Sequence, residues 1–94
     1  MIRNFKHKGL KELRSKGRTA KIGAKFHGRV IEILDALDQV EVLADLEIPG
    51  LDLHRHKGKR STTWAVSVNG PWRITFEFDA STKEVFDVDF EQYH

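Results

Sequence analysis

The hydrophobic pattern of this 94-residue chain changes its period at the break Ile48-Pro49-Gly50. Before the break, apolar residues recur at the three- and four-residue spacing of a helix, and after it they alternate with polar residues. One backbone cannot satisfy both patterns, because a helix repeats about every 3.6 residues and a strand every second residue. The chain therefore combines helices with a sheet. Its length leaves room for one modest core, so we expect a single domain over residues 1–94.

Two helices are predicted before the break. Leu10 and Leu13 lie in a lysine-rich stretch that Gly17 ends, which is typical of a short helix with a glycine stop. A second, clearer helix has one continuous apolar stripe. The stripe consists of Phe26, Val30, Ile33, Leu34 and Leu37. Alternation over residues 1–5 predicts a short N-terminal strand, and residues 40–46 predict an irregular or single-turn segment.

Alternating segments follow the break. One of them buries Trp64, Val66 and Val68. It ends at Asn69-Gly70, a strong hairpin signal, although Pro71 argues against a regular two-residue loop. Two further strands have apolar faces made of Trp72, Ile74, Phe76 and Phe78, and of Phe86, Val88 and Phe90. The predicted fold is α+β, with a short N-terminal strand and two helices packed on one face of an antiparallel sheet of three to five strands.

Alternation also assigns charged side chains to the opposite, open face of the sheet. Arg73 lies between Trp72 and Ile74, so it must turn away from the helices, and His54 opposes Leu53 in the same way. The acids of the last strand are also expected there. They are Asp87, Asp89 and Glu91. These acids would repel a phosphate unless they pair with Arg73 or with nearby lysines.

Charge is segregated along the chain. Residues 1–29 hold ten Lys/Arg and one acid, and residues 54–73 hold five Lys/Arg and no acid. Residues 30–53 hold seven acids and no Lys/Arg, and residues 74–94 hold six acids and one lysine. Two basic blocks separated by acidic ones indicate a surface with a positive side that can meet phosphates. Ordinary solubility charge is the alternative explanation.

Several classes of function are disfavoured by composition. The absence of cysteine excludes disulfides, thiolate nucleophiles and cysteine-based zinc sites, and it suits a cytoplasmic protein. No apolar run fits a signal peptide or a membrane span. His54 and His56 could share a metal, but no third ligand is evident, so no metal is expected. His7 and His27 lie in basic stretches and are expected to be solvated.

Three short clusters carry the residue types that cutting an RNA phosphodiester requires. They are residues 53–58, the pair Trp72-Arg73, and the pair Tyr93-His94. Imidazoles can move a proton near neutral pH, fixed cations can stabilise charge on phosphorus, and a phenol can stack or orient.

The same stretches resemble a known family. The segments are Ile48–His54 with Lys57-Gly58, Trp64–Phe76, and Val88–His94, and the opening Met1–Leu10 fits too. Together they resemble the HigB toxins of the RelE-like superfamily over essentially the whole chain. The most specific pieces are the strand pair around Asn69-Gly70-Pro71-Trp72-Arg73 and the Tyr93-His94 pair.

This resemblance implies a bacterial toxin of a type II toxin–antitoxin system. Members are ribosome-dependent endoribonucleases that cut messenger RNA and inhibit translation, and they use no metal or cofactor. A helix-turn-helix, HigA-like antitoxin neutralises them. The implied partners are therefore the antitoxin, the ribosome and mRNA, with DNA contacted only through the antitoxin complex and no membrane involved.

The resemblance also implies site residues. The family's active-site set falls on the catalytic candidates His54, Arg73, Tyr93 and His94 and on Lys57. Lys57 is expected to bind the substrate together with the neighbouring Lys59 and Arg60. Many relatives have Asp where this chain has Gln92, which cannot accept a proton, and Glu91 would replace it only if the strand end twists. As a hypothesis, His54 and His94 divide the acid and base roles. Arg73 and Lys57 hold the phosphate, and Tyr93 stacks on a base or orients the leaving group.

Two other functions remain open from the sequence. One is a non-catalytic module that binds RNA or the ribosome through the same basic surface, a possibility that Gln92 leaves open. The other is a protein whose main role is to dock the antitoxin.

Overall fold

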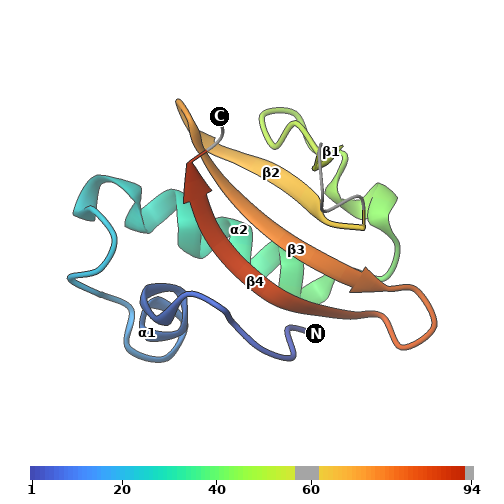
Figure 1. Cartoon of the computed structure of the whole chain (residues 1–94), viewed down its shortest axis with the longest axis horizontal. Coiled ribbons are helices and arrows are strands. Elements are labelled where there is room, and N and C mark those ends of the chain that lie inside the picture. The colour runs from blue at the N-terminus through green and yellow to red at the C-terminus, as the bar shows by residue number, and fades with distance from the viewer. Residues whose placement is uncertain (57–61, 93–94) are drawn as a thin grey trace.

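The computed structural model describes residues 1–56 and 62–92. Within this part, two helices pack on one face of a four-stranded antiparallel sheet of order β1-β2-β3-β4, as Figure 1 shows. The elements are α1 (Lys8–Lys16), α2 (His27–Gln39), β1 (His54–Arg55), β2 (Trp64–Asn69), β3 (Trp72–Asp79) and β4 (Glu84–Gln92). Two 3-10 turns, η1 (Ala24–Phe26) and η2 (Leu43–Leu46), complete them. The predicted α+β class is confirmed.

Helix α1 has a defined signal at each end. The Nδ1 atom of His7 accepts a hydrogen bond from the backbone N–H of Gly9 at 3.0 Å, which satisfies one of the otherwise unbonded groups of the first turn. Gly17 ends the helix in the left-handed conformation, with φ at 78°, and its N–H donates to the Leu13 carbonyl. Glycine adopts this conformation without steric cost. The predicted glycine stop is confirmed.

Helix α2 is held by packing. Its stripe of Val30, Ile33, Leu34 and Leu37 is at most 2% exposed, and Phe26 precedes it in η1. The helix has no acidic residue in its first turn and no basic residue in its last, so its own charges do not support its dipole. Arg14 of α1 compensates from outside, with Nη1 2.5 Å from Asp35 and Nη2 3.0 Å from Asp38.

The core lies between α2 and the sheet. Figure 1 shows α2 running behind the strands. From the sheet, Val66, Ile74, Phe76, Val85 and Val88 contribute side chains that are 0% exposed. At one end, the ring of Trp72 stacks on Phe90 with centroids 4.7 Å apart and planes within 6°. No helix in the described part of the chain is long and apolar enough to cross a bilayer.

The N-terminal segment lies beside β4 but does not form the predicted strand. Among the described residues it makes two isolated parallel bridges, Ile2 to Val85 and Phe5 to Val88. Asp87 interrupts the pairing between them, because its backbone adopts a φ of 51°. The side chain of Asn4 binds this residue twice: its Oδ1 accepts from the Asp87 N–H, and its Nδ2 donates to the Asp87 carboxylate, each at 3.0 Å.

The irregularity at Asp87 also corrects the predicted buried face of the last strand. The register between β3 and β4 shifts, so that Phe86 opposes Glu77 instead of entering the core. The guanidinium of Arg3 covers the Phe86 ring at 4.2 Å. Val85 takes the core position and is fully buried. An extra residue in one strand reverses the alternation on one side of it, which explains the wrong prediction.

The β2–β3 hairpin loop lies one residue later than predicted. Asn69 pairs with Trp72, so the two loop residues are Gly70 and Pro71, and Gly70 has a φ of 56°. A positive φ at the first loop position suits a type II′ turn. Proline has no N–H to donate to the ladder, so a place in the loop is favourable for it.

Candidate active site on the open face of the sheet

One row of side chains crosses all four strands on the face that α2 does not cover. His54 of β1 opposes Ala65 of β2, Ala65 opposes Thr75 of β3, and Thr75 opposes Asp89 of β4. Directly opposed residues in antiparallel strands point to the same face. The middle of the row is made of small side chains, with Ala65 0% and Thr75 2% exposed. His54 and Asp89 flank them and are half-buried.

A second row, two residues further along β3, contains Arg73. Its neighbours across the strands are Ser67 and Glu91. Arg73 Nη1 donates to the carbonyls of Gly70 at 2.6 Å and Trp72 at 3.0 Å, which anchors the guanidinium beside the β2–β3 turn. The register thus puts Arg73 on the same face as His54, as the alternation predicted.

His54 and Arg73 lie in neighbouring rows of the same face. Their backbones lie two strands apart and are offset by two residues along the strands. With strand spacing near 4.8 Å and a rise near 3.3 Å per residue, this places their Cα atoms about 12 Å apart. Both residues thus lie on the same face of the sheet, on either side of β2.

The carboxylates expected on this face are only partly there. Asp89 and Glu91 lie on it, opposite Thr75 and Arg73. Asp87 does not follow the alternation, because it is the irregular residue that Asn4 binds. Two acids of the predicted trio therefore remain on this face, and one of them, Glu91, lies in the same row as Arg73.

Buried threonines hold two carboxylates on this side of the sheet, a feature that the sequence reasoning missed. The Thr75 hydroxyl donates to Glu91 Oε2, and the Thr63 hydroxyl donates to Glu77 Oε2. Both threonines are at most 5% exposed. Alternation did indicate that Thr75 faces away from the helices. Its burial depends on neighbours from several strands, which no local pattern reports.

Glu91 needs no twist of the strand to reach the site. It opposes Arg73 directly, whereas Gln92 opposes Trp72 and is exposed at the end of β4. Residues 90 and 92 share a face by alternation, and Phe90 belongs to the core. In this register the carboxylate beside Arg73 therefore belongs to Glu91.

The remaining predicted site residues lie outside the described part of the chain. They are Lys57, Lys59 and Arg60 in one segment and Tyr93 and His94 in the other. Among residues 1–56 and 62–92, no group of three or more His, Asp or Glu side chains is arranged to hold a metal ion.

His7 and His27 are less exposed than the sequence predicted. Both are half-buried. His7 caps α1, and its ring contacts the edge of Phe90 with centroids 5.9 Å apart. His27 Nε2 lies 2.8 Å from the Ile22 carbonyl. Both imidazoles thus have structural partners away from the open-face rows.

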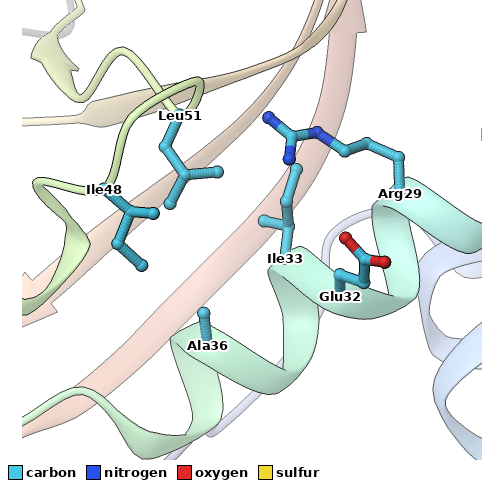
Figure 2. A pocket seen from close by; sticks show the side chains of 6 residues that line it. All are labelled: Arg29, Glu32, Ile33, Ala36, Ile48 and Leu51. Carbon is cyan, nitrogen blue, oxygen red and sulfur yellow. The ribbon is translucent and has the colours of Figure 1, made fainter.

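A shallow pocket of about 130 Å³ lies on the helix side of the sheet, between α2 and the segment that leads to β1. Figure 2 shows its lining of Arg29, Glu32, Ile33, Ala36, Ile48 and Leu51. It belongs to the covered side and is separate from the rows of His54 and Arg73.

Comparison with known proteins gives the family. Residues 3–94 match the model described as RelE-like toxin of type II toxin–antitoxin system HigB. Endoribonuclease HigB of Proteus vulgaris is 37% identical over 94 residues, covering all of both chains. A solution structure of a conserved hypothetical protein from Helicobacter pylori covers 98% of this chain and 94% of its own at 18% identity, with a TM-score of 0.44.

The chain belongs to the HigB-like family of RelE-like toxins of type II toxin–antitoxin systems. An antitoxin is therefore its partner.

Proposed function

We propose that this toxin is an endoribonuclease that cuts messenger RNA on the ribosome and so inhibits translation. The observation that carries the proposal is that His54 and Arg73, from strands β1 and β3, share the open face of the sheet. The name and full-length similarity of the Proteus vulgaris relative support the same chemistry. The action belongs in the cytoplasm, where the ribosomes are.

The proposed reaction uses the RNA's own 2′-hydroxyl as the nucleophile. A base removes the hydroxyl proton, and the 2′-oxygen attacks the adjacent phosphorus. The bond from phosphorus to the 5′-oxygen breaks, and an acid protonates that oxygen. The products are a 2′,3′-cyclic phosphate and a free 5′-hydroxyl. No metal or cofactor takes part in this scheme.

The residues divide these tasks. His54 and His94 exchange the protons, since an imidazole can give or take a proton near neutral pH. Arg73, with the lysines and arginine of the 57–60 segment, stabilises the charge that develops on phosphorus. Tyr93 stacks on a base or orients the leaving group.

The basic N-terminal block is proposed to contact ribosomal RNA. Lys8, Lys11, Lys16 and Arg18 are exposed on and just after α1. Arg14 is excluded from this surface, because it binds Asp35 and Asp38 of α2. Binding through phosphates releases counterions, so affinity for ribosomes should fall steeply between low and moderate salt. An affinity that does not change with salt would contradict this contact.

Cleavage by His54→Gln and His27→Gln variants tests the enzymatic proposal. His27 is the matched control, since it lies at the start of α2 and its ring is bonded to the Ile22 carbonyl. New 5′ ends are mapped by primer extension on messages translated in a purified system. We expect His54→Gln to cut roughly 10²–10⁴-fold more slowly and His27→Gln to cut like the wild type. Equal rates for all three proteins would exclude His54 from the chemistry.

The second candidate function is a module that binds RNA or the ribosome without cutting. Gln92 and the acids on the open face favour it. Such a module would stall ribosomes without creating new RNA ends. Wild-type toxin that arrests translation and leaves messages intact would establish this alternative. A form lacking His94 that arrests growth as strongly as the wild type would point the same way.

A further inference from the structure

Strand β1 is too short to fix His54 by itself. It contains two residues and pairs with β2 at two positions, at the edge of the sheet. Strands in globular proteins usually have about five or six residues. The position of the His54 ring therefore depends on the segment that leads into β1, residues 48–53.

That segment closes one turn within itself and is anchored to the rest of the fold at two points. The turn is closed by the Leu51 N–H, which donates to the Ile48 carbonyl at 3.0 Å, and the first anchor is the Ser67 N–H of β2, which donates to the Leu51 carbonyl at 2.7 Å. Arg29 supplies the second anchor from α2: its Nη2 donates to the Gly50 carbonyl at 2.8 Å and lies 3.5 Å from the Ser67 carbonyl. Figure 2 shows the Arg29 side chain extending from α2 toward the Leu51 segment. One guanidinium thus joins α2, this segment and β2.

The anchored segment in turn determines which ring nitrogen of His54 carries the hydrogen. Asp52 has a φ of 50°, and its carbonyl oxygen lies 2.8 Å from His54 Nδ1. A carbonyl oxygen can only accept a hydrogen bond, so Nδ1 must carry the hydrogen. In the neutral ring the lone pair is then on Nε2, which makes Nε2 the nitrogen that takes a proton.

We propose that Arg29 is a positioning residue for His54. By holding the Gly50 carbonyl, it keeps the backbone of Asp52 in the left-handed conformation, whose carbonyl selects the Nδ1–H form of the His54 ring. The inference rests on the proposed nuclease function for its kinetic consequence. Its spectroscopic consequence stands without that function.

The tautomer of the His54 ring tests the proposal directly. In long-range ¹H–¹⁵N spectra of the full-length toxin, above the pH at which imidazoles lose their charge, wild-type His54 should show Nδ1 protonated. An unconstrained imidazole in water prefers the Nε2–H form, so Arg29→Met should shift His54 toward that form. Arg29→Lys keeps one donor and should restore part of the wild-type pattern. Arg14→Met, an equivalent change on α1, should leave His54 unchanged.

Cleavage rates provide the second readout. With saturating ribosomes and a single turnover, Arg29→Met should cut roughly 10–100-fold more slowly, because small misplacements of a catalytic group have effects of this size. Binding to ribosomes should change less than the rate. A His54 ring that stays in the Nδ1–H form in Arg29→Met would overturn the proposal whatever the activity. If the wild type does not cut RNA, the proposed function fails, while the tautomer result still decides the role of Arg29.

A pair of variants at Asp52 tests the same link without touching the guanidinium. Asp52→Gly keeps access to a positive φ and should preserve the tautomer and the cleavage rate. Asp52→Val disfavours that conformation, because the residue is β-branched, and should change both. Identical His54 spectra in the two variants would contradict the role assigned to the Asp52 carbonyl.

Discussion

The two faces of the sheet differ in what they bury. The covered face presents Val66, Ile74, Phe76 and Val88, all fully buried and apolar. The open face buries a threonine hydroxyl and half-buries Arg73 and Glu91. Burying polar groups costs free energy that their hydrogen bonds offset, whereas an apolar face carries no such cost. Buried polar groups of this kind are expected at functional sites. We propose that the covered face accounts for folding and the open face for activity.

Truncation on the covered face should have the largest effect on stability. Phe76→Ala removes a fully buried ring beneath α2 and should lower the free energy of unfolding by about 3–5 kcal/mol. Urea titration followed by circular dichroism measures the change. A loss below about 1 kcal/mol would mean that the core is not where the sheet meets α2.

The adjacent position on the open face gives a matched comparison. Thr75→Val keeps the shape and removes the hydroxyl that binds Glu91. We expect a loss of about 1–2 kcal/mol in folding stability, because one hydrogen bond to a carboxylate disappears. Cleavage should fall several-fold, since Glu91 beside Arg73 is no longer held. If Thr75→Val destabilised the protein as much as Phe76→Ala while leaving cleavage intact, the division between the faces would be wrong.

Lowering the pH should have the smallest effect on folding stability, and the carboxylates responsible lie outside both open-face rows. Hydrogen bonds hold the carboxyl pKa of three residues below its usual value: the Lys21 side chain does so for Glu12, two backbone N–H groups for Asp45, and the Ser81 hydroxyl for Asp79. A lowered pKa in the folded state stabilises the fold above the ordinary carboxyl pKa of about 4. This contribution is lost as pH falls through the lowered values.

Urea midpoints measured from pH 7 down to pH 3 check this sign. The midpoint should stay level above about pH 5 and fall below about pH 4, and Asp45→Asn should show a smaller fall than the wild type. A midpoint that rises on acidification would contradict the direction.

The spacing of residues along the sequence predicted the parts of the fold that depend on nearby residues. The stripe of α2, the glycine stop of α1 and the face that carries Arg73 follow from spacing alone. The irregularity at Asp87 does not, because it depends on Asn4, which is 83 residues away in sequence. Phe86 was therefore placed on the wrong face. The hairpin loop lies one residue later than predicted, because Pro71 occupies it. The prediction gave the Asn-Gly signal more weight than the proline.

The site divides in the same way. The faces of His54 and Arg73 were predictable from alternation. The bond between Thr75 and Glu91 was not, because it joins neighbouring strands whose pairing is fixed by the whole sheet. Nor was the link from Arg29 to the Gly50 carbonyl, which joins a helix to a loop 21 residues away.

The RNA cleavage rate of the Arg73→Ala variant, compared with that of Arg14→Ala, tests most directly the claim that the open face cuts RNA. Both changes remove one arginine, the first from the open face and the second from the ion pairs between α1 and α2. Mapping of 5′ ends on translated messages should show that Arg73→Ala cuts roughly 10²–10³-fold more slowly, while Arg14→Ala cuts like the wild type. Wild-type cleavage by a folded Arg73→Ala protein would contradict the assignment of RNA cutting to the open face.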